Sequence, residues 1–583
     1  MAKDILERYK AAELPIPAEM WVWPLYGAGF ENLGRDGKPV KVPVPSYGPD
    51  ELLIRHDAVG LCFSDVKVIK AGNTHPRLQG RDMQANPVIL GHEVALTVVG
   101  VGANLRDQFH VGQRFIIQAD IYIKGETYAY GYVLPGGLAQ YNVVGDEVLH
   151  GDEGCYLLPI HADLPYASVA LTEPWSCVEA AYHINYRPHW AGDGVVWVIG
   201  TAAGQGRAYT LGQPWAQGEK PRRILLSAVP ADLKAHVQAQ AAQWGIPVSE
   251  IAWDGAAVAK AKEMTGGEGV DDIVVLGADA DAIEAVLTSL ADGGVLNIVA
   301  DKPMPRPVQV DVGRLHYDHI AIVGTTSAAV ADGYAPIRTE VKAGGKAWFL
   351  GSAGPMGQML VQYAIESPDR PATVVAHDLV SRRMGDFARK FEPLAASRGV
   401  ELYCLSEEAL GREGFHAKLR EIAPHGFDDI VVTAPTPKAV EAAMPFVGRG
   451  GVVNIFAGLS RGTMATLDLT PVYQMGVRFT GSSGSSIEDM RRTLRRAETG
   501  ALYPSQVVAA VASLSGAYDG LQAVAESRFP GKVVIYPHIA ELPLTTLPEL
   551  ADRLPQVYKR LERGSIWTKE AEDELLRQML PGA

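Results

Sequence analysis

The sequence has few of the features that mark secreted, membrane-spanning and nucleic-acid-binding proteins. Only four cysteines occur among 583 residues, spaced too widely for a disulfide framework or a four-cysteine zinc lobe. No apolar run reaches the ~18 residues that a membrane span needs, and the charged N-terminus MAKDILERYK lacks the apolar core of a signal peptide. A net charge of −14 argues against nucleic acid or an anionic membrane as the main partner. We therefore expect a cytoplasmic protein with small-molecule partners.

The rest of the composition is that of a folded protein, with 47% hydrophobic and 21% charged residues in a length that suits three or four domains. Residues from about 40 to 160 form short apolar runs separated by glycine, proline and asparagine, which predicts a mostly β domain. TEPWSCVEAAYHINY, from Thr172, has helical spacing and predicts a helix leaving that domain. The charged C-terminal stretch predicts a helical tail, either a solvated amphipathic helix or a subunit contact.

The middle of the chain contains an internal duplication. DDIVVLGADADAIEAVLTSLADGGVLNIVA begins at Asp271, and DDIVVTAPTPKAVEAAMPFVGRGGVVNIFA begins at Asp428, 157 positions later. Gly324 and Gly481 keep the same spacing. Apolar strands alternate with alanine-rich helices in both copies, which is typical of βαβ units. We therefore expect two tandem doubly wound parallel sheets.

The second copy has the stronger dinucleotide-binding pattern. A strand that ends in spaced glycines before a helix lets a pyrophosphate approach the amides at the helix N-terminus. Asp378 ends the next strand and is placed to bind the adenosine ribose, which favours NAD. Arg382 and Arg383 follow it and leave NADP possible, because either could receive a 2′-phosphate. The turn itself, GSAGPMG, supplies the predicted cofactor-binding residues Gly351, Gly354, Pro355, Met356 and Gly357.

The first copy has a weaker pattern, GTAAGQG. It keeps Gly200 and Gly206 but has Ala203 in place of the middle glycine, and its next strand ends in Ser227 with no carboxylate. We therefore predict that the second copy binds the cofactor. The first copy has either lost dinucleotide binding or binds something smaller.

Potential metal ligands are concentrated in the β-rich part. GLCFSDVK contains Cys62, LGHEV contains His92 and Glu93, and LTEPWSC contains Glu173. Each has an ordinary explanation by itself, such as a buried cysteine or a helix-starting Glu-Pro. Together they offer one thiolate, one imidazole and two carboxylates, which suits a catalytic zinc.

At these residues the chain resembles a zinc-dependent member of the medium-chain dehydrogenase/reductase superfamily, nearest to its sorbitol/polyol dehydrogenase branch. The motifs that carry the resemblance span about residues 40–190 and 345–537. They are G-x-C-x-S-D around Cys62, G-H-E at 91–93, VGVGANLRDQFHVGQRF, GGLAQY at 136–141, E-P at 173–174, the second glycine turn, GSSGSS at 481–486 and the closing GKVVIYP.

The resemblance implies an α/β fold with a GroES-like β-rich catalytic domain and two Rossmann domains, although the family has one Rossmann domain and this chain has two. The degenerate copy follows the E-P helix directly, so the order of the domains leaves open which copy faces the zinc. The predicted parts are residues 1–185 (catalytic, completed by 500–540), 190–335 (first Rossmann domain), 345–499 (second Rossmann domain) and 541–583 (helical tail).

The resemblance also implies roles for the site residues. Cys62 and His92 would bind zinc directly, and Glu93 and Glu173 would be ligands or act through water. Cys177 would lie near the nicotinamide.

Further residues would handle the proton. Ser64 would pass on the substrate proton, and Asp65 would orient the zinc-binding histidine. Lys67 stands where the family has a relay histidine, so the proton would leave through Lys67, through a neighbour such as His56, or through water.

The resemblance implies a Zn²⁺- and NAD(P)-dependent dehydrogenase that acts on a secondary alcohol of a polyol, sugar or sugar phosphate, in a homodimer or homotetramer. An insertion carries Lys70, His75, Arg77 and Arg81, which form either a solvated loop or an anion pocket. Two alternatives remain open. Both Rossmann domains could bind cofactor in an epimerase-like enzyme, or the first could be a regulatory or assembly module.

Overall fold

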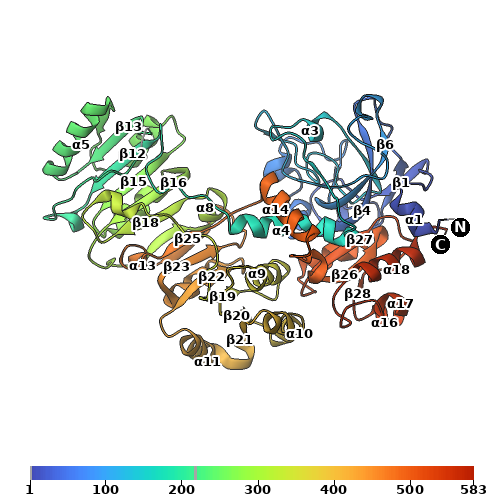
Figure 1. The fold of residues 1–583 in the computed structure, drawn as a ribbon. Helices are drawn as coiled ribbons and strands as arrows, with labels where there is room; N and C mark the ends of the chain where they lie inside the picture. Colours follow the sequence, from blue (N-terminus) through green and yellow to red (C-terminus); the bar gives the residue numbers. More distant parts are fainter. Residues whose placement is uncertain (1–2, 216–218, 583) are drawn as a thin grey trace. The chain divides into compact units, whose positions relative to one another are not determined.

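The computed structural model describes residues 3–215 and 219–582. The chain divides into two compact units (Figure 1). The first unit consists of Met1–Ala180, Ala353–Met359 and Gly484–Ala583, and the second of Ala181–Ser352 and Leu360–Ser483. Among the described residues, every helix is too short or too polar to cross a lipid bilayer.

The first unit is built on an eight-stranded sheet in the order β11-β7-β6-β4-β27-β26-β28, with β10 also paired to β4. The central strand β4 is buried along its whole length and pairs antiparallel with β6, β10 and β27. A strand from near the end of the chain therefore completes the N-terminal sheet. The strands are β4 (Leu52–Gly60), β6 (Glu93–Val101), β7 (Arg114–Ile117), β10 (Tyr141–Val144), β11 (Leu157–Pro159), β26 (Val508–Ser513), β27 (Lys532–Tyr536) and β28 (Thr545–Thr546).

Three small antiparallel pairs and nine α-helices complete the described part of this unit. The pairs are β1 (Glu19–Val22) with β3 (Val40–Pro43), β2 (Pro24–Leu25) with β5 (Val88–Ile89), and β8 (Tyr122–Ile123) with β9 (Glu126–Thr127). The helices are α1 (Ile5–Lys10), α2 (Phe63–Ala71), α3 (Asp146–Leu149), α4 (Tyr166–Ala181, which ends at the unit boundary), α14 (Ile487–Glu498), α15 (Ala517–Ala525), α16 (Leu550–Arg553), α17 (Pro555–Tyr558) and α18 (Lys569–Met579).

The C-terminal tail is packed into the first unit. The α18 residues Ala571, Leu575 and Leu576 are buried. Glu572 is buried too, and its carboxylate accepts hydrogen bonds from the backbone amides of Tyr166 and Ala167. These are the first amides of α4, which lack an intrahelical acceptor. A tail carboxylate thus caps α4, and the helix begins before Thr172, where the sequence pattern first indicates it.

The second unit contains two six-stranded parallel sheets (Figure 1), in the orders β14-β13-β12-β15-β16-β18 and β21-β20-β19-β22-β23-β25. Each order reads 3-2-1-4-5-6 along its own copy, which is the Rossmann arrangement. The prediction of two tandem doubly wound sheets is confirmed. The first sheet is β12 (Val195–Gly200), β13 (Arg223–Ser227), β14 (Val248–Glu250), β15 (Val270–Leu276), β16 (Leu290–Val299) and β18 (Ala321–Thr325); the second is β19 (Lys346–Leu350), β20 (Thr373–Asp378), β21 (Glu401–Ser406), β22 (Phe427–Val432), β23 (Val447–Ile455) and β25 (Arg478–Thr480).

The two copies share details that the sequence repeat alone does not reveal. Arg187 binds Asp272 at 2.8 Å, and Arg338 binds the equivalent Asp429 at 2.6 Å. The helices are α5 (Ala231–Trp244), α6 (Ala257–Met264), α7 (Ala280–Leu287), α8 (Val312–Tyr317), α9 (Pro355–Glu366), α10 (Ser381–Ser397), α11 (Glu407–Ile422), α12 (Pro437–Ala443) and α13 (Thr470–Gln474), and the remaining strands are β17 (Val308–Asp311) and β24 (Met464–Leu467).

The copies differ after their first strand. In the second, β19 leads through the glycine turn into α9; in the first, β12 leads into a single 3₁₀ turn, Ala202–Gly204. Residues 201–215 and 219–222 contain no α-helix. Tyr209, Leu211 and Trp215 pack instead into the core of the first sheet. The first glycine turn therefore lacks the helix N-terminus that a pyrophosphate would need.

Candidate active site

Three of the predicted metal ligands converge in the first unit. Cys62 caps the start of α2, and His92 and Glu93 lie at the start of β6. One ligand atom from each, the Cys62 sulfur, a His92 ring nitrogen and a Glu93 carboxylate oxygen, all lie within 4.8 Å of one another. One thiolate, one imidazole and one carboxylate at this spacing form a donor set that zinc accepts.

Glycines in the two motifs make room for this cluster. Gly60 pairs with Glu93 across β4 and β6, and a Cβ at Gly60 would lie 2.1 Å from Glu93 Oε2. Gly91 has a φ of +97°, which L side chains rarely adopt, and it turns the chain just before His92. The glycines of GLC and GHE are therefore steric requirements of the cluster.

The ring of His92 is held by its neighbours. Asp65 Oδ1 lies 3.2 Å from His92 Nδ1, and Ser64 Oγ lies 3.2 Å from Nε2. Burial lowers the pKa of His92, but the Asp65 carboxylate and further contacts more than offset it and raise the pKa well above its usual value. When a cation occupies the cluster, a proton on Nδ1 directed at Asp65 would leave Nε2, on the side of Ser64, free to bind it.

Lys532 is a site residue that sequence reasoning missed. It begins β27, and its ammonium forms a buried ion pair with Glu93 Oε1. Glu93 Oε2 is also buried and has no hydrogen-bond partner among the described residues. A buried carboxylate oxygen without a partner is costly unless a cation completes it. The cluster therefore fits a zinc ion. The only sequence signal for Lys532 is its place in GKVVIYP.

Glu173 and Cys177 reach the same neighbourhood from α4, although their ligand atoms fall outside the 4.8 Å group. Burial raises the pKa of Glu173 to about 7; nearby His92 opposes this shift and Glu93 adds to it. Burial also raises the pKa of Cys177 well above its usual value, with Glu173 and Asp120 adding to the effect. These mutual effects indicate that both side chains lie close to the cluster.

The predicted proton-exit residues are placed differently from one another. Lys67 lies on an exposed face of α2. His56 is fully buried, with Nδ1 2.8 Å from the Ala139 carbonyl and Nε2 2.7 Å from the Tyr130 hydroxyl. Both nitrogens of His56 thus have partners outside the metal-ligand cluster, so these contacts do not support His56 as a proton exit.

Tyr132 was not singled out in the sequence. Its ring centroid lies 5.6 Å from that of His92 and 5.7 Å from that of His75. Burial raises the pKa of Tyr132 to about 12, and a hydrogen bond with Ser64 opposes this rise. Tyr132 therefore links Ser64 to the insertion.

The insertion is more ordered than a solvated loop. Arg81 donates to the backbone carbonyls of Tyr132, Val133, Asn86 and Pro87, so its guanidinium holds the loop. Arg77 is only partly buried, forms a 2.6 Å ion pair with Asp120 and lies over the Tyr132 ring. Arg77 is thus the insertion arginine that remains accessible beside Tyr132.

The second glycine turn has the geometry of a phosphate-binding loop. Gly351 has a φ of +81°, and a Cβ there would lie 2.7 Å from Thr433 Oγ1. The amides of Gly351 and Ser352 both donate to the His377 carbonyl at 2.9 Å, which fixes the turn against β20. Helix α9 begins at Pro355, so its first-turn amides lack intrahelical acceptors.

The predicted ribose-binding residue lies at the end of β20. Asp378 is buried, and Arg383 Nη1 is 3.7 Å from its Oδ1. Arg383 Nε is buried without a partner among the described residues, whereas Arg382 is exposed. The carboxylate and one unsatisfied guanidinium nitrogen therefore lie side by side.

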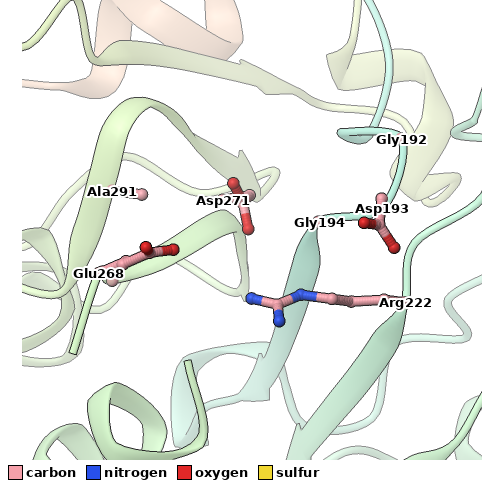
Figure 2. Close-up of a pocket in the computed structure, with 8 residues that line it drawn as sticks. Gly192, Asp193, Gly194, Arg222, Glu268, Asp271 and Ala291 are labelled. Atoms are coloured by element: carbon pink, nitrogen blue, oxygen red, sulfur yellow. The ribbon is translucent and has the colours of Figure 1, made fainter. Parts of the chain in front are cut away.

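A polar hollow of about 360 Å³ lies in the first Rossmann copy. Figure 2 shows residues that line it, among them Asp193, Arg222, Glu268 and Asp271. The lining residues Gly194, Arg222 and Gly269 directly precede β12, β13 and β15. Ligands of such sheets bind beyond the carboxyl ends of the strands. This hollow is at the opposite edge and does not match a dinucleotide site.

Comparisons with known proteins agree with this geometry. A family model described as "Alcohol dehydrogenase GroES-like domain" matches residues 48–151. Mannitol-1-phosphate 5-dehydrogenase of Aliivibrio fischeri is 29% identical over 50% of this chain and 71% of its own length. L-sorbose 1-phosphate reductase of Klebsiella pneumoniae is 23% identical over 93% of this chain and 95% of its own length. The family model and both relatives support the recognition of the chain as a member of the medium-chain dehydrogenase/reductase superfamily.

This assignment confirms the recognition made from the motifs, and the GroES-like part of the predicted fold with it. The range that the family model matches contains Cys62, His92 and Glu93. A solved structure of 2R,3R-butanediol dehydrogenase from Bacillus subtilis has a TM-score of 0.50 and 14% identity, and the match covers 89% of this chain and 99% of that one. This likeness is one of fold.

Proposed function

We propose that this protein is a zinc-dependent, NAD(P)-linked dehydrogenase that oxidises or reduces a secondary alcohol position of a polyol, sugar or sugar phosphate. The main support is the cluster of Cys62, His92 and Glu93, whose ligand atoms lie within 4.8 Å of one another beside an unsatisfied buried oxygen. The relatives named mannitol-1-phosphate 5-dehydrogenase and L-sorbose 1-phosphate reductase support the substrate class.

Cys62, His92 and Glu93 would hold the zinc, with Glu173 as a further ligand or a partner through water. When bound, zinc supplies a Lewis acid for the alcohol oxygen, and NAD(P) supplies the hydride acceptor. Asp65 would hold a proton on His92 Nδ1, which leaves Nε2 to bind the zinc.

Ser64 is the proposed acceptor of the substrate hydroxyl proton. Its contact with Tyr132 offers a route away from the cluster, toward the ring of His75. Lys67, exposed on α2, stays a prediction as the outer end of that route.

Gly351, Gly354, Pro355, Met356 and Gly357 would bind the cofactor pyrophosphate, and Asp378 its ribose. We propose NAD as the preferred cofactor, because a buried carboxylate repels a 2′-phosphate. The unsatisfied Arg383 Nε is the feature that would let NADP bind.

We propose Arg77 as the contact for a substrate phosphate, since it is partly exposed and stacks on Tyr132 next to the cluster. Its partner Asp120 would exchange places with the anion. An epimerase-like use of both Rossmann copies is less well supported, because the first turn has no helix in residues 201–215 and 219–222.

Two finer points stay predictions. The four cysteines are unpaired, which supports a reducing compartment such as the cytoplasm. The predicted homodimer or homotetramer would use a surface other than the face at which β17 and β24 pair.

The test is a panel of polyols and sugar phosphates assayed by NADH and NADPH absorbance, with metal analysis of the purified protein. Cys62→Ser should lose zinc and at least ~10–100-fold of activity, since even the loss of a residue that only orients a metal ligand typically costs this much. Cys404→Ser, in β21 of the other unit, is the matched control and should keep both. Full activity of a zinc-free preparation would refute the proposal.

A further inference from the structure

The two Rossmann copies contact each other through repeat-equivalent strands. β17 and β24 form an antiparallel pair in the second unit, in which Gln309 lies opposite Thr466. With the 157-residue repeat, Thr466 is the counterpart of Gln309 itself. Val308 lies opposite Leu467, the counterpart of Val310, and Val310 lies opposite the counterpart of Val308. The two strands therefore pair as the same strand of two identical subunits would pair across a twofold axis, which is called an isologous contact.

The helices and edge strands show the same exchange. α8 of the first copy contacts β25 of the second, and α13 of the second contacts β18 of the first. α8 and α13 are counterparts, as are β18 and β25, which also contact each other. In Figure 1, β18, β25, α8 and α13 lie together where the two sheets meet. The contact therefore extends beyond one pair of strands.

Two counterpart glycines allow this close approach. A Cβ at Gly324 would lie 2.8 Å from the Tyr473 Cβ, and a Cβ at Gly481 would lie 2.6 Å from the Leu315 carbonyl. Gly324 thus faces α13 while its counterpart Gly481 faces α8. Neither position has space for a side chain, although a Cβ at Gly324 would also lie 2.5 Å from the Ile298 carbonyl of its own copy.

The contact is apolar at its centre and polar at its rim. The side chains of Val308, Val310, Leu467 and Val472 are fully buried in one cluster that includes residues of both copies. Around it, Gln309 donates to Thr466 Oγ1 at 2.8 Å, and Arg461 binds Asp318 at 2.6 Å. A buried apolar core with a hydrogen-bonded rim is typical of a stable subunit interface.

We infer that the first Rossmann copy serves the second as a covalently attached partner subunit, closing the sheet edge that would otherwise bind a second copy of this chain. The first copy differs from the second at the glycine turn, where it has Ala203 and no following helix. The contact face keeps its counterpart glycines. Exposed edges invite association between chains, and here the duplication closes them within one chain. This role is independent of the proposed activity.

Engineered cysteines test the inference in the full chain. Gln309 and Thr466 are exposed and directly opposite, so cysteines there should fold and lie within disulfide reach. Under mild oxidation, Gln309→Cys/Thr466→Cys should form a disulfide within one 62.6 kDa chain. The single variants should give no more covalent dimer than the wild type, whose four native cysteines set the background.

The single variants make the test decisive. If the first copies of two chains paired through this face, Gln309 of one chain would lie opposite Gln309 of the other. Gln309→Cys alone would then yield a covalent dimer. A covalent dimer of either single variant, or of the double variant, would overturn the inference. So would a double variant that stays reduced, because its two cysteines would then not face each other in solution.

Discussion

At the scale of single residues, the ion pair between Lys532 and Glu93 makes the site dependent on a cation. Both side chains are buried, and Glu93 Oε2 has no other partner among the described residues. Burial lowers the pKa of Lys532, but Glu93 raises it by more, so the lysine stays charged. Removing one member of a buried pair leaves an uncompensated charge, which typically costs about 3–5 kcal/mol.

We therefore predict that Lys532→Met lowers the thermal stability of the metal-free protein by about this amount, and that zinc restores much of it by neutralising Glu93. Thermal unfolding with and without zinc measures both effects. Lys38→Met, at an exposed lysine of the same unit, should change neither. A variant that zinc does not stabilise more than the wild type would contradict zinc binding at Glu93.

Two buried histidines predict acid sensitivity. Burial lowers the pKa of His56 to about 4, although its hydrogen bond to the Ala139 carbonyl opposes this shift, and burial and Arg55 lower the pKa of His538 to about 3. Between these values and the ~6.5 of an unfolded histidine, the unfolded chain binds more protons than the folded one. Stability should therefore be complete above about pH 6.5 and fall on acidification, by up to ~1.4 kcal/mol per pH unit for each histidine.

Unfolding midpoints at pH 7 and pH 5 test this sign. His56→Gln should be less stable at pH 7, because its two hydrogen bonds are disturbed, yet lose less stability between pH 7 and pH 5 than the wild type does. His110→Gln, at an exposed histidine of the same unit, should follow the wild type. An unchanged pH dependence in His56→Gln would show that His56 is not the group responsible.

At the scale of elements, α4 depends on the C-terminal tail. Glu572 accepts bonds from the Tyr166 and Ala167 amides and from the Tyr536 hydroxyl, at 2.8 Å for the last two. A carboxylate at a helix N-terminus also interacts favourably with the helix dipole. Since α4 carries Glu173, the tail positions one wall of the candidate metal site.

Glu572→Ala should leave two amides and a hydroxyl buried without acceptors and lower stability by about 1–3 kcal/mol or more. It should also lower zinc retention, because the start of α4 loosens. Thermal unfolding and metal analysis measure the two effects, and Glu570→Ala, exposed on the same helix, is the control. A stable variant that loses zinc, or no change in either quantity, would rule out a capping role.

The elements also show what the sequence could predict. Two sheets followed from the repeat beginning at Asp271 and Asp428, because strand and helix patterns are local properties. The absence of a helix after Gly200 could not be predicted in this way, because Tyr209, Leu211 and Trp215 fill its place only through contacts with the sheet. Lys532 could not be assigned either, since its pairing with Glu93 depends on β27 lying beside β4.

At the scale of the whole molecule, the two copies differ at the glycine turn and share one contact face. The second copy keeps a turn followed by a helix and the buried Asp378, and the first keeps the contact face. The candidate metal ligands converge in one place among the described residues. A chain with one competent turn and one metal cluster is expected to have one active site.

We therefore predict one NADH bound per 62.6 kDa chain in calorimetric titration. Gly351→Val should abolish this binding, since Gly351 has a positive φ and no space for a side chain. Gly206→Ala in the first copy is the matched control, because Gly206 also has a positive φ but open space around it, and binding should persist. Two NADH per chain would favour the epimerase-like reading, because both turns would then hold a cofactor. If binding of one NADH persists in Gly351→Val but is lost in Gly206→Ala, the cofactor belongs to the first copy. This result would contradict the argument from the missing helix of that copy.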